Sequence, residues 1–341
     1  MSEQDEALFT TIVGSFPLEN TPKNMAIALN DQINLGIDFP CYPQLISMTD
    51  QFLSPLSEVI PELRKENGKF ILSDDFELPD TPLATEYGEF VINFLRDNPR
   101  LKRKIKGIKA CLTGPFTLTS EVILEGKIAQ NVKPRLFNEP RAIMVDWIVD
   151  KFASIMKEIG KHYDEMGFNI ISMDEPILGL LVGKKVMFYS SEFVVDSLNK
   201  AISDISRWSS IHVCGRISPN LRDLLLKTDV NILDHEFITN KGNFDLFEKA
   251  HFEDFDKYLA LGTVATQFKP KEEGTLDDYV ESVEEIQKII EKGINLYGKE
   301  NLFIKPDCGF KPLKDSFEER FAYEITMKKL NNMVLAANIA K

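Results

Sequence analysis

Residues with zinc-binding side chains follow predicted β-strands that lie far apart in the sequence. His212 and Cys214 are separated by one residue at the end of one apolar run, and Cys308 lies in a Pro-Asp-Cys-Gly turn after another. Side chains two residues apart on a strand face the same side, so His212 and Cys214 can bind the same ion. Zinc takes histidine nitrogen and cysteine sulfur in a tetrahedral arrangement. Glu236 ends an intervening strand and adds a carboxylate, so we predict that these four residues form a zinc site.

The His-x-Cys spacing by itself is also typical of a buried histidine and a small apolar cysteine in a strand. Cys308 is harder to explain in this way, because a cysteine beside a glycine in a turn is a poor core residue. His235 could replace its neighbour Glu236 as a ligand, but adjacent strand residues face opposite sides, so only one is expected to point inward. His162 and His251 fall in helical patterns and are expected at the surface or in packing.

A zinc ion held by two thiolates and a carboxylate carries a net negative charge. Such a site is poorly suited to acidify water but keeps a bound sulfur nucleophilic. The carboxylate is the weakest of these ligands and can leave when a substrate thiol arrives. Zinc removes the thiol proton outright, whereas a free thiol with a pKa of about 8.5 is only slightly ionised at neutral pH. The predicted chemistry is therefore alkyl transfer to sulfur.

Polar residues also follow two other predicted strands. Asp174-Glu175-Pro176 closes one of them, and Asp174 is a candidate catalytic residue that holds the ammonium group of an amino-acid substrate. The acidic pair also fits a helix N-terminus with proline in the first turn, and one acid can serve each role. Gly14 and Ser15 can offer amide and hydroxyl groups to a substrate carboxylate, although they also fit a tight turn between a strand and a helix.

Short apolar runs alternate with helical patterns along the chain. We expect strands at residues 9–13, 35–39, 108–112, 168–173, 209–213, 230–233, 258–263 and 302–304. Helical patterns lie between most of them, for example at residues 140–166, 276–292 and 316–337. Eight strands that alternate with helices favour a closed (β/α)8 TIM barrel, in which the strands' carboxyl ends meet at one mouth. A doubly wound open sheet is the alternative.

Residues 43–104 are too many for a simple connection between the second and third strands. This stretch is rich in proline and charge, and a helix is expected at residues 83–96. We expect a single catalytic domain over residues 1–341 in which residues 43–104 form an insertion over the barrel mouth. Such an insertion can act as a lid or a partner surface, and plain decoration of the barrel is the alternative.

The composition is that of a globular protein with a strongly acidic balance. Of the 341 residues, 43% are hydrophobic and 27% are charged, and the net charge of −13 disfavours a nucleic-acid partner. No apolar run is long enough to cross a membrane, and the acidic start lacks the basic and apolar regions of a signal peptide. The four cysteines are too few and too scattered for a disulfide scaffold. We therefore expect a cytoplasmic protein with reduced thiols.

Five segments of the chain resemble, in the same order, the catalytic domain of cobalamin-independent methionine synthase. The segments are Ile12-Val13-Gly14-Ser15-Phe16-Pro17, Leu112-Thr113-Gly114-Pro115-Phe116-Thr117, Met173-Asp174-Glu175-Pro176, His212-Val213-Cys214 and Pro306-Asp307-Cys308-Gly309. The resemblance runs from near residue 10 to near residue 313. It implies a zinc-dependent methyltransferase that forms methionine from homocysteine.

The resemblance also implies roles for individual residues. The family's metal ligands are His, Cys, Glu and Cys, which fall on His212, Cys214, Glu236 and Cys308. The family's homocysteine contacts fall on Gly14, Ser15 and Asp174. The family's second amine-binding glutamate has no clear counterpart here, and Glu86 is only a guess for it.

The chain has no room for the second barrel that helps the full-length family enzymes bind a folate donor. It looks like the short, single-barrel archaeal and bacterial relatives, which implies a methyl-corrinoid (methylcobalamin) donor presented by a partner protein. His212-Val213-Cys214-Gly215 is also similar to the motif of corrinoid:coenzyme M methyltransferases, so transfer to coenzyme M is an alternative. A non-catalytic, zinc-containing corrinoid-binding module is a second alternative. A decarboxylase of the related uroporphyrinogen decarboxylase superfamily is less favoured, because its chemistry needs no zinc thiolates.

Overall fold

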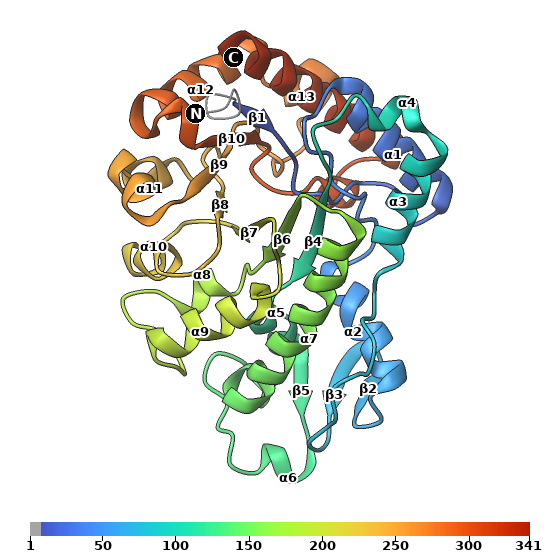
Figure 1. Ribbon diagram of the computed structural model, residues 1–341, viewed down its shortest axis with the longest axis vertical. Helices are drawn as coiled ribbons and strands as arrows, with labels where there is room; N and C mark the ends of the chain where they lie inside the picture. Colours follow the sequence, from blue (N-terminus) through green and yellow to red (C-terminus); the bar gives the residue numbers. More distant parts are fainter. Residues whose placement is uncertain (1–7) are drawn as a thin grey trace.

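The core of the protein is one parallel sheet that curls into a barrel. The computed structural model describes residues 8–341, so the acidic start that argued against a signal peptide lies outside the described residues. The seven strands of the sheet are all parallel, in the order β1-β10-β9-β8-β7-β6-β4 (Figure 1). Their bounds are β1 (Phe9–Thr10), β4 (Lys109–Thr113), β6 (Ile170–Asp174), β7 (Trp208–Val213), β8 (Ile232–His235), β9 (Tyr258–Gly262) and β10 (Leu302–Lys305).

The remaining predicted strand, expected at residues 35–39, joins the two edges of this sheet. Phe39 forms a parallel bridge with Thr11 next to β1, and Cys41 forms one with Lys109 on β4. Residues 37–41 therefore complete the barrel, although through single bridges. The prediction placed this strand too early, because helix α1 (Pro22–Leu35) continues to Leu35 and ends at Gly36, which has a left-handed φ of 86°. The TIM barrel is confirmed, and the open-sheet alternative is not.

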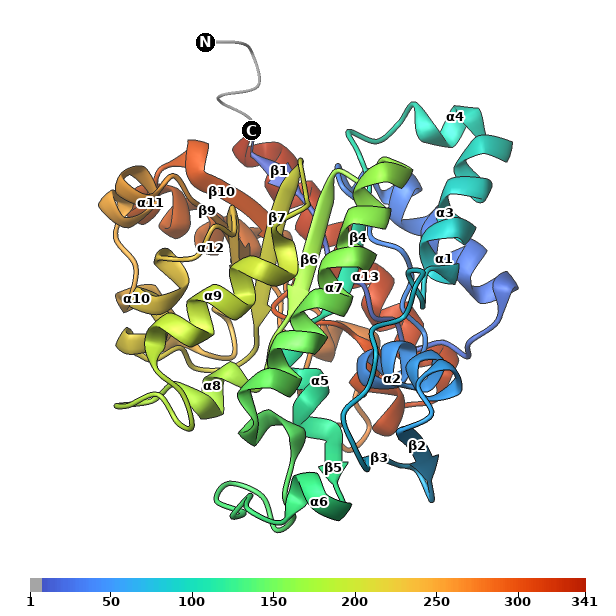
Figure 2. The same ribbon diagram turned by 60° about the horizontal axis from the view of Figure 1, so that its bottom comes forward.

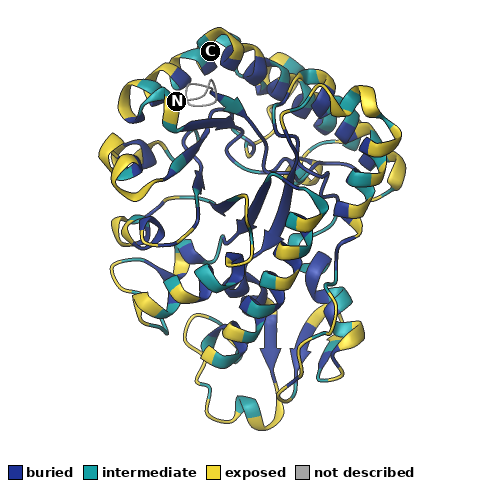
Figure 3. Ribbon diagram, in the orientation of Figure 1, coloured by how far each residue is buried: buried dark blue, intermediate teal, exposed yellow. Residues whose placement is uncertain are grey.

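Helices surround the sheet, with their buried faces toward it and their exposed faces outward (Figures 1 and 3). After α1 they are α2 (Met48–Val59), α3 (Glu86–Asp97), α4 (Pro99–Lys102), α5 (Pro115–Glu121), α6 (Gly126–Ala129), α7 (Asp146–Met166), α8 (Leu178–Leu181), α9 (Ser191–Ile202), α10 (Pro219–Leu226), α11 (Lys249–Phe255), α12 (Val283–Tyr297) and α13 (Glu319–Ala340). Short 3₁₀ helices are η1 (Ala142–Met144), η2 (Lys241–Asp245), η3 (Leu276–Tyr279), η4 (Lys299–Asn301) and η5 (Lys311–Asp315). No helix in the described part of the chain has the length and apolarity needed to span a membrane.

Local capping decides where the predicted helices begin and end. The helical pattern expected at residues 276–292 divides into η3 and α12, because Ser282 and Glu285 form a capping box that starts α12. The pattern expected from residue 140 starts only at Asp146, after η1, and ends at Gly167, whose φ is 95°. The helices shift relative to the predictions, but each remains in its expected place along the chain.

The predicted insertion contains α2, α3, α4 and a hairpin. Strands β2 (Leu63–Glu66) and β3 (Lys69–Leu72) pair antiparallel, and β3 pairs in parallel with β5 (Val122–Leu124). Because β5 follows β4 and α5, this small sheet lies at the end of the barrel toward which β4 runs (Figure 2). The helix expected at residues 83–96 corresponds to α3. A lid function for residues 43–104, and a single catalytic domain over the whole chain, stay predictions.

Apolar residues close one end of the barrel, and charged residues occupy its interior nearer the mouth. A separate apolar cluster of Phe39, Ile170, Ile232, Ala260 and Phe303 lies at or near the starts of the strands. Asp234 and Lys305 lie near the carboxyl ends of β8 and β10, and Lys109 extends toward Asp234 from the start of β4. All three side chains are at most 1% exposed. Buried charges require partners, so these residues point to a site at the mouth.

Candidate metal and substrate site

Three of the four predicted metal ligands lie together at the barrel mouth. His212 Nε2 lies 3.0 Å from Cys214 Sγ, and Cys214 Sγ lies 3.3 Å from Cys308 Sγ. The three ligand atoms all lie within 4.8 Å of one another. His212 belongs to β7, and Cys308 follows β10, so barrel closure alone brings them together. One nitrogen and two sulfur donors at this spacing fit a tetrahedral zinc ion.

The two cysteine thiols interact with each other electrostatically. Hydrogen bonds from Cys214 and His212 hold the pKa of Cys308 well below its ordinary value. The contact with Cys308, together with burial, raises the pKa of Cys214. The two thiols therefore oppose each other's ionisation, and a nearby cation favours ionisation of both.

The carboxylate of Glu236 does not belong to this three-residue group. Glu236 directly follows β8, and its Oε2 accepts hydrogen bonds from Thr239 Oγ1 at 2.8 Å and Asn240 Nδ2 at 2.6 Å. Its Oε1 accepts no hydrogen bond from the part of the chain that the structure describes. Glu236 as fourth ligand thus stays a prediction.

His235 points away from the barrel interior. Its ring stacks on Phe247 with centroids 5.7 Å apart, and its Nδ1 lies 3.3 Å from the carbonyl of Val213. Burial lowers the pKa of His235 to about 3, so the ring is neutral. Alternation along β8 explains this orientation, since Asp234 faces inward.

Asp307 connects the turn that carries Cys308 to the loop that carries Glu236. Its carboxylate accepts hydrogen bonds from the amides of Phe237, Ile238 and Thr239 at 2.7 to 3.1 Å. Thr239 Oγ1 lies 2.8 Å from this carboxylate and 2.8 Å from Glu236, so the two carboxylates share its single proton. One buried carboxylate thereby fixes the two loops relative to each other.

A buried ion cluster lies directly behind His212. Asp234 Oδ1 lies 2.5 Å from both His212 Nδ1 and Lys305 Nζ, and Asp234 Oδ2 lies 3.5 Å from Lys109 Nζ. Although burial raises the pKa of Asp234, the lysines and His212 lower it well below its usual value. Burial lowers the pKa of His212, but Asp234 more than offsets this and raises it to about 10.

The sequence analysis missed the ion cluster as a functional feature. The available signal was charge inside apolar strand patterns, since Lys109 lies among Ile108, Ala110 and Cys111, and Lys305 follows Ile304. A lysine in a buried strand needs a partner. The sequence does not show which acid supplies it.

Asp174 ends β6 directly beside His212 on β7. It is 5% exposed, and its Oδ1 has no hydrogen-bond partner among the described residues. Burial raises the pKa of Asp174 to about 7, although His212 and Lys109 oppose this shift. A buried carboxylate oxygen without a partner is costly, and an incoming ammonium group would satisfy it.

Glu175 has the other role predicted for the acidic pair. Its carboxylate accepts hydrogen bonds from the amides of Phe116 and Thr117 at 2.9 Å, and from Thr117 Oγ1 at 2.6 Å. These amides belong to the first turn of α5, where a carboxylate is favourable. Burial raises the pKa of Glu175 to about 8, and these hydrogen bonds oppose the shift. One acid therefore serves the helix, and Asp174 is left for a ligand.

The Gly14–Ser15 turn lies against the Cys308 turn. A Cβ on Gly309 would collide with Ser15 Oγ, and Phe310 donates its amide to the carbonyl of Ser15 at 2.9 Å. The hydroxyl and amide of Ser15 make no hydrogen bond to any residue that the structure describes. They are therefore free to bind a substrate group at the same mouth.

A buried thiol pair supports this turn from behind. Cys41 Sγ lies 3.4 Å from Cys111 Sγ, and Cys111 Sγ lies 3.0 Å from the carbonyl of Val13. These two cysteines lie apart from the candidate metal group and pack beneath Gly14. All four cysteines of the chain are free in the structure.

Replacing Gly14 with alanine is expected to displace this turn. Gly14 has a φ of 121°, and an added Cβ would lie 2.7 Å from Cys41 Sγ. Strain of this kind costs roughly 1–3 kcal/mol, so we expect a melting temperature lower by several degrees and weaker substrate binding. Calorimetry and substrate titration measure the two effects. Gly68→Ala, at a φ of 77° with no atom within 4 Å, is a control for backbone strain alone.

Glu86 is not brought to the site by any contact. It is exposed in the first turn of α3, which packs against α7. In the described chain it makes no hydrogen bond or ion pair with Asp174, Ser15 or His212. Glu86 as an amine-binding residue stays a prediction, and the geometry lends it no support.

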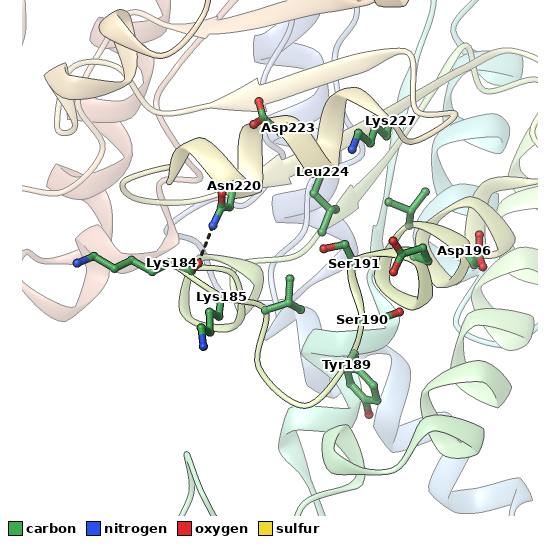
Figure 4. A pocket seen from close by; sticks show the side chains of 13 residues that line it. Lys184, Lys185, Tyr189, Ser190, Ser191, Asp196, Asn220, Asp223, Leu224 and Lys227 are labelled. Carbon is green, nitrogen blue, oxygen red and sulfur yellow. Dashed lines mark hydrogen bonds between the residues drawn. The ribbon is translucent and has the colours of Figure 1, made fainter.

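A separate cavity of about 630 Å³ lies beside α9 and α10 (Figure 4). The Lys184 and Lys185 side chains lie at its edge, and Asn220 Nδ2 donates to the carbonyl of Lys184 at 2.9 Å. Asp196 and Asp223 also line it, so its charge is mixed. None of the predicted site residues lines this cavity.

The fold and the site together define an α/β-barrel enzyme with thiol and imidazole donors at its mouth. The model of the family described as "Cobalamin-independent synthase, Catalytic domain" matches residues 98–339. The methionine synthase of Methanothermobacter thermautotrophicus is 27% identical over 97% of this chain and 99% of its own length. The solved structure of a B12-independent methionine synthase from Shewanella sp. W3-18-1 superposes with a TM-score of 0.65 at 17% identity, covering 98% of each chain.

The chain belongs to the cobalamin-independent methionine synthase family and is a methyltransferase. The resemblance found in the sequence is thereby confirmed. A further relative from Thermodesulfovibrio yellowstonii is named 5-methyltetrahydropteroyltriglutamate–homocysteine methyltransferase. It is 28% identical over 56% of this chain and 24% of its own length.

The predicted corrinoid donor and corrinoid-protein partner are wrong. The family is defined as cobalamin-independent, and the name of the relative from T. yellowstonii specifies a methyltetrahydropteroyl donor. The same finding removes the corrinoid:coenzyme M alternative and the corrinoid-binding module. The prediction rested on the short chain, and the length of a chain carries no information on the chemistry of its methyl donor.

Proposed function

We propose that this protein transfers the methyl group of a 5-methyltetrahydropteroyl glutamate to the sulfur of homocysteine and releases methionine. Donor and acceptor are those in the name of the relative from T. yellowstonii. The observation that carries the proposal is the group of His212, Cys214 and Cys308 beside the unpartnered carboxylate oxygen of Asp174. We also propose that residues 1–341 act as one catalytic unit.

The donor set fits zinc, with His212, Cys214 and Cys308 as three ligands and Glu236 as the fourth. Zinc, when bound, supplies a Lewis acid that lowers the pKa of a thiol, so that homocysteine reacts as a thiolate at neutral pH. Thr239 and Asn240 hold one oxygen of Glu236 by hydrogen bonds. These contacts leave Oε1 of Glu236, which has no partner among the described residues, as the oxygen that would bind the ion.

Asp174 and the Gly14–Ser15 turn orient the amino-acid end of homocysteine. The buried Asp174 carboxylate binds the ammonium group through a charge-assisted hydrogen bond. The Ser15 amide and hydroxyl bind the carboxylate, which agrees with their lack of partners among the described residues. With both groups of this end held, the substrate sulfur is directed toward the Cys308 turn, whose Gly309 packs against Ser15.

The reaction is a displacement at the methyl carbon. A lone pair of the homocysteine sulfur forms the new S–C bond, and the bond between the methyl carbon and N5 of the pterin breaks. The electron pair of that bond goes to N5, which takes up a proton. Holding the two reactants in line accounts for much of the acceleration in such reactions.

We expect the purified protein to form methionine from homocysteine with 5-methyltetrahydropteroyltriglutamate. Activity should disappear with a chelator and return with zinc. The measurement is product formation by mass spectrometry, with methylcobalamin as the comparison donor. Turnover with methylcobalamin and none with the pterin would contradict the proposed donor. Zinc binding with no methionine from either donor would contradict the proposed reaction.

A further inference from the structure

Lys305 contacts both halves of the candidate metal site from behind. Its Nζ lies 2.5 Å from Asp234 Oδ1 and donates to the carbonyl of Asp307 at 2.8 Å. Asp234 in turn holds His212 Nδ1, and Asp307 directly precedes Cys308. His212 lies on β7 and Cys308 follows β10, with β8 and β9 between them in the sheet. One side chain thus connects ligands from distant strands.

The contact to Asp234 also decides which nitrogen of His212 faces the cysteines. A carboxylate accepts hydrogen bonds only, so Nδ1 must carry the proton that lies between it and Asp234 Oδ1. Nε2 then faces Cys214, 3.0 Å away, and it is the nitrogen whose proton a metal ion would replace. A hydrogen bond of this kind on the far nitrogen commonly fixes the orientation of a metal-binding histidine.

We propose that Lys305 and Asp234 are positioning residues that hold His212 and Cys308 in the geometry of the metal site, an inference that rests on the proposed function. Lys305 fixes the Asp234 carboxylate and the Asp307 carbonyl at the same time. Asp234 then fixes the tautomer and the direction of the His212 ring. Both side chains are completely buried, so water cannot replace either contact when one is removed.

Lys109 provides a matched control for Lys305. Both lysines are buried against Asp234, but Lys109 lies 3.5 Å from the other oxygen and makes no contact with Asp307. Replacing either with methionine removes the same charge and keeps a similar shape. Coulomb's law alone predicts that removing a positive charge tightens the binding of a zinc cation. Loss of a positioning contact predicts the opposite.

The test is the zinc dissociation constant of full-length variants, measured by competition with a chromophoric chelator. We expect Lys305→Met to weaken zinc binding by about 10-fold to 100-fold, as loss of a contact to a metal-binding histidine does. Lys109→Met should bind zinc as tightly as the unchanged protein or more tightly. Equal or tighter binding by Lys305→Met, or equal weakening in both variants, overturns the proposal.

A second variant keeps the test decisive if Lys305→Met does not fold. Asp234→Asn should weaken zinc binding by a similar factor and change the tautomer of His212. Two-bond ¹H–¹⁵N correlation spectra of the zinc-loaded protein report this tautomer, and the chain has only 4 histidines to assign. An unchanged His212 tautomer with unchanged zinc affinity overturns the proposal. If the unchanged protein binds no zinc, the proposed function fails instead.

Discussion

Replacing Cys308 with serine is expected to remove zinc and methyl transfer together. Serine keeps the size of the side chain, but its hydroxyl does not ionise at neutral pH and cannot replace a thiolate that contacts both Cys214 and His212. The remaining His212 and Cys214 form too small a ligand set to retain the ion. We expect kcat to fall by about 10³-fold or more, the scale of a lost transition-state stabiliser, with metal content near zero. Plasma mass spectrometry and turnover measure the two quantities.

Cys41→Ser is the matched control for this variant. Cys41 is also a buried cysteine close to a second thiol, 3.4 Å from Cys111, but it lies beneath the Gly14 turn and outside the metal group. It should retain full zinc content and lose only some stability. Full zinc occupancy in Cys308→Ser, or equal zinc loss in Cys41→Ser, would show that the three-residue group is not the metal site.

Asp174→Asn is expected to raise the KM for homocysteine far more than it lowers kcat. The variant loses a charge-assisted hydrogen bond to the ammonium group, which is worth about 1.5–3 kcal/mol, or roughly 10-fold to 100-fold in affinity. Steady-state kinetics with varied homocysteine separates the two parameters. A fall in kcat at constant KM would place Asp174 in the chemical step instead of in substrate binding.

The same variant tests the pKa of Asp174. Burial raises this pKa to about 7, so the protonated carboxyl stabilises the fold at low pH. That stabilisation is lost as the pH rises from the ordinary value of about 4 toward 7. The gain in stability of Asp174→Asn over the unchanged protein should therefore be larger at pH 8 than at pH 5. Homocysteine binding by the unchanged protein should strengthen as the pH rises through about 7.

Glu175→Gln is the control for removing a buried acid beside the site. Glu175 holds the first turn of α5, so its loss should lower the melting temperature while changing the KM for homocysteine by about threefold at most. If Glu175→Gln raised the KM as much as Asp174→Asn, the assignment of separate roles to the two acids would be wrong.

Some parts of the site were predictable because they depend on local spacing. His212 and Cys214 share one face of β7 because strand side chains alternate, and the same rule separates Asp234 and Glu236 from His235. Seven of the eight apolar runs overlap named strands of the barrel. The segment at residues 37–41 was placed early, because nothing in its own pattern shows that α1 extends to Gly36.

Other parts depended on which strands become neighbours. The sequence left open which acid of the Asp174–Glu175 pair would serve a helix, and the position of α5 decided it. It placed Glu236 among the metal ligands, which stays a prediction, because Thr239 and Asn240 hold one oxygen of that carboxylate. It also led to a corrinoid donor, because the length of the chain was taken as evidence about the donor.

The sequence by itself determined the strands, the helices and the donor atoms available at each strand end, because these follow from periodicities of two and of 3.6 residues. Only the tertiary structure decided that His212 meets Cys308, and that Lys109, Asp234 and Lys305 form a buried cluster behind them. These residues come from different strands of the barrel. Their distances depend on barrel closure and strand register, which no local pattern encodes.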